Sequence, residues 1–82
     1  MINAIIMQKN RTYRVVLRKE PEGAYTVLVP SLPGCVTWGK TVEEALEMAK
    51  DAITGYINVL QEEGEQIPDD NETLEYSLQL TA

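Results

Sequence analysis

A short turn between two alternating segments constrains the fold of this chain more than any other feature. Pro21, Glu22 and Gly23 lie between residues 13–20 and residues 24–29, and a proline with a glycine two positions later is typical of a tight hairpin. Apolar side chains occupy every second position in both flanking segments, as in strands that bury one face. The sequence therefore predicts an antiparallel β-hairpin.

The length of the turn fixes the register of this hairpin. A three-residue loop pairs Glu20 with Ala24 and Leu17 with Val27, whereas a two-residue loop would turn one strand over. The three-residue loop is favoured because it keeps the alternating apolar residues of both strands on one face. These residues are Tyr13, Val15, Leu17, Tyr25, Val27 and Val29.

A long amphipathic segment predicts a helix over residues 42–62. Thr41 and Glu44 form a capping-box pattern at its start, and Gly64 is well placed to end it. Apolar residues recur along the segment at helical spacing, which indicates one face packed on a sheet. Gly55 lies inside the helix, where we expect it to allow a close approach to that sheet.

The remaining segments complete an α+β fold with the order β-β-β-α-β. Two prolines and a glycine make residues 30–34 a connection, after which residues 35–39 form a short third strand. Residues 74–80 alternate cleanly and are predicted to form the last strand. One long helix then covers one face of a mainly antiparallel sheet. The chain is a single domain over residues 1–82, with a core over 12–80 and an N-terminal lead-in or extra strand over 1–10.

The residue types that most catalytic and metal sites need are missing or scattered. The chain has no histidine, which excludes the usual serine and cysteine triads and most zinc sites. Cys35 is expected to be a small buried hydrophobe. Asp69, Asp70 and Glu72 lie close together, but their spacing matches no calcium loop, so we expect a solvated loop. We predict a protein that is not an enzyme and that holds no metal and no cofactor.

The single cysteine and the missing signal-peptide pattern are typical of a cytoplasmic protein. Its charge is unevenly distributed around a net value of −6. Acidic residues dominate from residue 40 onward, and such a surface either attracts a basic partner or serves only solubility. The basic residues gather before residue 20. Weak RNA binding is another hypothesis, in which the contacts come from Arg11, Arg14, Arg18 and Lys19 together with Tyr13 and Tyr25.

One face of the predicted sheet has nothing in the chain to cover it. The helix lies on the other face, and the uncovered face carries Val16, Leu28 and Val36. Apolar patches of this kind mark interfaces. We expect a homodimer or a higher homo-oligomer that uses these residues.

A string of residues from the hairpin to the end of the helix forms a recognisable pattern. It contains Leu-Pro-Gly-Cys at residues 32–35 and Gly-x-Thr-x-Glu-Glu-Ala at residues 39–45. The other residues that match are Gly23, Tyr25, Pro30, Gly64, Ile67 and Pro68. This pattern resembles the HicB-like antitoxin family.

The resemblance implies a truncated, partial RNase H-like fold that lacks the nuclease carboxylates. It also implies an antitoxin that binds a small basic HicA-like toxin, which cleaves messenger RNA, and neutralises that toxin by occluding it. On this interpretation we expect the partner-binding surface at Ser31, Leu32, Pro33, Gly34, Trp38, Glu43, Glu47 and Asp51.

The sequence departs from the fuller family pattern at its end. Many members continue into a ribbon-helix-helix or helix-turn-helix segment that binds operator DNA, and here that segment does not follow residues 74–80. We therefore do not expect direct DNA binding. An orphan HicB-like homo-oligomer that binds another, unknown ligand stays open as the alternative.

Overall fold

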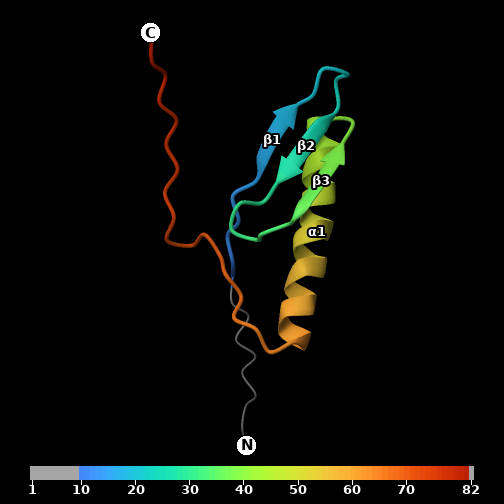
Figure 1. The fold of residues 1–82 in the computed structure, drawn as a ribbon, viewed down its shortest axis with the longest axis vertical. Helices are drawn as coiled ribbons and strands as arrows, with labels where there is room; N and C mark the ends of the chain where they lie inside the picture. The colour runs from blue at the N-terminus through green and yellow to red at the C-terminus, as the bar shows by residue number, and fades with distance from the viewer. Residues whose placement is uncertain (1–9, 82) are drawn as a thin grey trace, which may run out of the picture.

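A computed structural model describes residues 10–81 of the chain. It contains strands β1 (Val16–Lys19), β2 (Tyr25–Leu28) and β3 (Val36–Gly39), followed by helix α1 (Val42–Glu62). The strands form an antiparallel sheet in the order β1-β2-β3, and α1 lies across one face of it (Figure 1). The α+β class and the single covering helix are confirmed.

The hairpin has the predicted register. Leu17 lies opposite Val27, and the N–H of Glu20 donates a 2.8 Å hydrogen bond to the carbonyl of Ala24. Gly23 has a φ of 98°, a left-handed conformation that glycine adopts without steric cost. The turn chemistry and the alternation therefore select the same pairing.

Both ends of α1 follow the signals in the sequence. The Thr41 hydroxyl accepts a 3.0 Å hydrogen bond from the N–H of Glu44, and the Glu44 carboxylate accepts one of 2.7 Å from the N–H of Lys40. At the other end Gly64 has a φ of 68°. The next N–H then reaches back to the carbonyl of Leu60 at 2.8 Å, which is the Schellman arrangement that closes many helices.

Small residues bring the helix against the sheet. Val27, Ala45 and Ala49 form a buried cluster between α1 and the strands. A Cβ atom on Gly39 would overlap the backbone of Ala45, so the first turn of the helix lies directly on β3. Gly55, which was expected to allow the close approach, has no neighbour within 4 Å of such an atom. Gly39 has this role instead.

Residues 74–80 do not form the predicted last strand. They are extended, but none of them pairs within the described sheet. Figure 1 shows the segment, orange to red, running apart from β1 and away from the sheet. A strand needs a neighbour for its backbone N–H and C=O groups, and these residues have none in the described chain. We call residues 73–81 the arm. The predicted extra strand over residues 1–10 lies, except for Asn10, outside the described residues.

Candidate functional site

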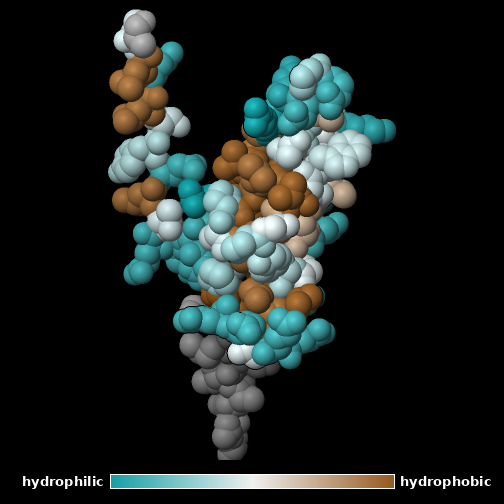
Figure 2. Space-filling model, in the orientation of Figure 1, coloured by the Kyte–Doolittle hydropathy of each residue, from teal (hydrophilic) through white to brown (hydrophobic). Residues whose placement is uncertain are grey.

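The sheet face turned away from α1 carries large, uncovered apolar side chains. Val16, Leu28 and Val36 are cross-strand neighbours, and Trp38 lies in the next row, opposite Thr26. Val36 and Trp38 are 54% and 55% exposed. Figure 2 shows a hydrophobic cluster over the strands on this side of the molecule. We call Val16, Leu28, Val36 and Trp38 the open face. A contiguous apolar patch of this kind is typical of an interaction surface.

Polar groups border the open face beside the tryptophan. The Glu20 carboxylate accepts a 2.9 Å hydrogen bond from the hydroxyl of Thr26. Glu20 and Lys40 line a shallow depression together with Trp38, and Arg18 lies across from Thr26 on the same face. The open face therefore has an apolar centre and a rim that carries both signs of charge, as many protein interfaces do.

The loop between β2 and β3 presents only part of what was expected of it. Pro33 and Gly34 are exposed, whereas Leu32 is 1% exposed and packs against Val29 in the core. Leu32 therefore does not belong to the exposed surface predicted for it. The buried Leu32 side chain anchors the loop to the core, because the burial of an apolar side chain is favourable. The Tyr56 hydroxyl donates a 2.7 Å hydrogen bond to the carbonyl of Pro33, which ties the loop to the helix.

Ser31 contacts a buried carboxylate that the sequence reasoning missed. Asp70 is 4% exposed, and it accepts hydrogen bonds from the Ser31 hydroxyl at 3.1 Å and from the N–H of Arg14 at 2.8 Å. The Arg14 Nε atom lies 3.5 Å away. The Arg14 backbone hydrogen bond is the main cause that lowers the pKa of Asp70. The expectation of a solvated loop is wrong for Asp70, because its partners come from distant segments that local spacing does not report.

The predicted acidic residues of the helix lie on its outer side. Glu43, Glu47 and Asp51 are exposed and follow one another at intervals of four residues, so they form one row. Ala45 and Ala49 face the sheet from the opposite side of the helix. The structure therefore separates this acidic row from Trp38, and it brings Trp38 together with the expected dimer residues.

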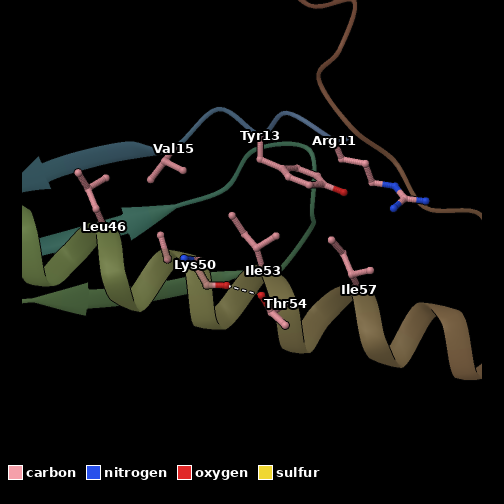
Figure 3. Close-up of a pocket in the computed structure, with 9 residues that line it drawn as sticks. Arg11, Tyr13, Val15, Leu46, Lys50, Ile53, Thr54 and Ile57 are labelled. Atoms are coloured by element: carbon pink, nitrogen blue, oxygen red, sulfur yellow. Dashed lines mark hydrogen bonds between the residues drawn. The ribbon is translucent and has the colours of Figure 1, made fainter. Parts of the chain in front are cut away.

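A groove that no sequence pattern predicted runs between α1 and the segment that leads into β1. Figure 3 shows Tyr13 and Val15 on one wall and Leu46, Ile53 and Ile57 on the helix wall. Its volume is about 440 Å³, and Arg11, Ala49, Lys50 and Thr54 complete the lining. We call this feature the groove.

Among the described residues, the side chains that most often bind metals are dispersed and the single thiol is buried. Within residues 10–81 no three histidine, cysteine or carboxylate side chains gather to hold a metal ion. Cys35 is buried, and burial raises its pKa, which disfavours the reactive thiolate. No helix in the described part of the chain combines the length and the apolar character needed to cross a membrane.

Comparison with known proteins points to one family. A family model described as the HicB_like antitoxin of bacterial toxin-antitoxin systems matches residues 13–80. The crystal structure of the N-terminal domain of Burkholderia pseudomallei antitoxin HicB is similar, with a TM-score of 0.62 at 28% sequence identity. The similarity covers 83% of this chain and 72% of that one.

Similar proteins fall into a short and a long group. A UPF0150 protein of Thermoplasma acidophilum is 51% identical over 59 residues, which is 72% of this chain and 86% of that protein. Antitoxin HicB of Escherichia coli K12 is 43% identical over 56 residues, which is 68% of this chain but 41% of that protein. The chain thus matches most of the short relative and less than half of the longer one.

Proposed function

This chain belongs to the HicB-like antitoxin family, and we propose that it is a non-catalytic binding domain that neutralises a small, basic, HicA-like toxin. In this proposal the toxin cleaves messenger RNA in the cytoplasm, and the antitoxin covers the surface that the RNA would use. The observation that carries the proposal is the open face, where a half-exposed tryptophan stands among exposed aliphatic side chains.

The open face has the composition of a contact surface. A tryptophan that becomes fully buried on binding is among the residues that contribute most to affinity. Leu28 and Val36 extend the apolar area from Trp38 toward Pro33 and Gly34, with which they line a second shallow depression. The tie between Tyr56 and Pro33 holds this end of the surface in place before a partner arrives, which lowers the entropic cost of binding.

The acidic row supports the same proposal from the other side of the molecule. Glu43, Glu47 and Asp51 lie on the outer side of α1, so they do not touch a partner seated on the open face. Their field still attracts a basic protein over a distance comparable to the Debye length, about 8 Å at physiological salt. We assign them to the rate of association, while the open face supplies the contact.

The expected dimer residues need a new assignment because they share the open face with Trp38. One surface cannot be covered by a toxin and by a second copy at the same time. We therefore assign Val16, Leu28 and Val36 to the toxin contact. The homodimer that we also propose uses another part of the molecule.

Co-expression tests this function directly. The full chain is produced together with the short basic protein encoded beside its own gene, and cell growth and a pull-down are measured. We expect a stable complex and restored growth. Since Trp38 is the chain's single tryptophan, its fluorescence emission should shift to shorter wavelength when the complex forms. No complex and no rescue would contradict the proposal.

Substitutions locate the contact. Trp38→Ala should weaken the complex by about tenfold or more. Val36→Ala should also weaken it, whereas Val59→Ala provides a matched control, because Val59 is 50% exposed on the helix, against 54% for Val36. If both valine variants bind like the unaltered chain and Trp38→Ala has no effect, the open face is not the contact surface.

A further inference from the structure

The arm has the side-chain pattern of a strand, and it pairs with no strand among residues 10–81. Leu74, Tyr76, Leu78 and Leu80 alternate with polar residues and are 79% to 86% exposed. A segment with an apolar row on one side is a ready partner for a sheet edge. It is therefore expected to have an occupant on that side in solution.

Contacts at its base fix where the arm leaves the body. The Asn71 side chain accepts a 2.7 Å hydrogen bond from the N–H of Thr12 and donates one of 3.0 Å to the carbonyl of Asn10. The Glu75 carboxylate lies 3.4 Å from the Arg14 guanidinium. The rest of the arm, orange to red, is separated from its own sheet (Figure 1). These contacts direct the rest of the arm outward.

A site with the matching chemistry lies on the same domain. β1 is at the edge of the described sheet and pairs with β2 alone, so its outer backbone groups are open to another strand. The groove lies between α1 and the segment that leads into this edge strand, and its walls are mainly aliphatic and aromatic (Figure 3). Leu46 on the helix wall is 48% exposed. A strand added beside β1 and continued along residues 11–15 would place every second side chain in the groove.

The lengths of the two parts agree. In a strand Tyr76 and Leu80 are about 13 Å apart, at about 3.3 Å per residue. In a helix Leu46 and Ile57 are about 16 Å apart, at 1.5 Å per residue. Three apolar side chains of the arm, at positions 76, 78 and 80, therefore fit within the length of the helix wall.

We propose that two copies of this chain exchange arms, so that residues 76–80 of each copy add a strand to the outer edge of β1 in the other. Tyr76, Leu78 and Leu80 fill the partner's groove, and Ser77 and Gln79 face solvent. The exchange completes the β-β-β-α-β order across two chains and leaves the open face free. It goes beyond the proposed function, because it needs no toxin.

The oligomeric state of the full chain tests the exchange. Sedimentation or light scattering should show a concentration-dependent dimer. Leu78→Asp should raise its dissociation constant by about tenfold or more, because it places a charge in an apolar site. Gln79→Asp adds the same charge one residue away on the solvent side and should leave the dimer intact. A monomer at all concentrations would overturn the proposal, as would a dimer that Leu78→Asp leaves unchanged and Val36→Asp dissociates.

Cross-linking separates exchange from closure of the arm on its own chain. One copy carries Leu46→Cys and a second, differently tagged copy carries Leu78→Cys, while Cys35 stays buried in both. Mixing under mild oxidation should give a covalent heterodimer. If the double variant instead gives a cross-linked monomer and the mixture gives no heterodimer, the arm closes within one chain and the exchange is wrong. Circular dichroism of each variant confirms that the domain is folded.

Discussion

The backbone N–H of Arg14 donates a 2.8 Å hydrogen bond to the buried carboxylate of Asp70. This contact joins the segment before β1 to the segment after α1. The Asp70 N–H also donates to the carbonyl of Thr12 at 2.7 Å, so the two segments are held from both sides. The base of the arm depends on this junction.

Asp70→Asn should destabilise the domain by about 1–3 kcal/mol at pH 7, because it replaces a charged acceptor inside a buried network. The pKa of Asp70 is lowered in the folded state, so its contribution is complete above the unfolded pKa, near 4, and is lost as the pH falls through the folded value. The free energies of unfolding of the two proteins should therefore begin to converge as the pH falls below about 4.

Urea unfolding at several pH values measures this difference. Asp69→Asn is the control, because the Asp69 side chain accepts from the Asn71 N–H at 3.0 Å and an amide oxygen can replace it there. An Asp70→Asn gap that stays constant from pH 7 to pH 3 would show that the charge of Asp70 does not stabilise the fold.

Two glycines should respond to alanine in opposite directions. Gly39→Ala should destabilise the domain by about 1–3 kcal/mol or more, because its Cβ would overlap the Ala45 backbone. Gly55→Ala should stabilise it by about 1 kcal/mol, because the site is open and alanine favours a helix. Thermal unfolding of both variants checks this pair. Equal effects would mean that α1 does not rest on β3 at Gly39.

Tyr56→Phe should cost about 0.5–1.5 kcal/mol, the usual net contribution of one hydrogen bond. It removes the 2.7 Å bond to the Pro33 carbonyl and leaves the aromatic ring in the core. Amide hydrogen exchange should become faster in the loop around Pro33 and stay unchanged in the hairpin. Tyr76→Phe in the arm is the control and should not alter exchange in this loop.

Much of this fold was predictable because its signals are local. The register of the hairpin follows from Gly23 and the alternation around it. The bounds of α1 follow from Thr41, Glu44 and Gly64, since the atoms that satisfy each helix end lie within a few residues. Patterns that extend over a few residues therefore predict hydrogen bonds between neighbouring residues well.

The parts that were missed depend on distant residues. The alternation in the arm predicts a segment that suits a half-buried strand. It does not predict which strand pairs with it. Gly39 and Gly55 are the same residue type, and only the packing of α1 on β3 decides which one must lack a side chain. The burial of Leu32 and Asp70 likewise depends on segments remote in sequence, as does the separation of Trp38 from the acidic row.

The acidic row should act on the rate of association with the toxin and hardly on the rate of dissociation, so the dissociation constant changes by the same factor as the association rate. The triple variant Glu43→Gln, Glu47→Gln and Asp51→Asn should slow association by about tenfold at low salt, since steering by charge raises association rates by 10-fold or more. The loss should shrink as salt is added, because salt screens the field. Stopped-flow fluorescence of Trp38 measures the association rate and its dependence on salt.

A control variant removes the same amount of negative charge from the end of α1, through Glu62→Gln, Glu63→Gln and Glu65→Gln. It tests whether the position of the charge matters or only its amount. If the control slows association as much as the triple variant, net charge alone sets the rate. If dissociation speeds up instead, the row touches the toxin directly, and the contact surface is not confined to the open face.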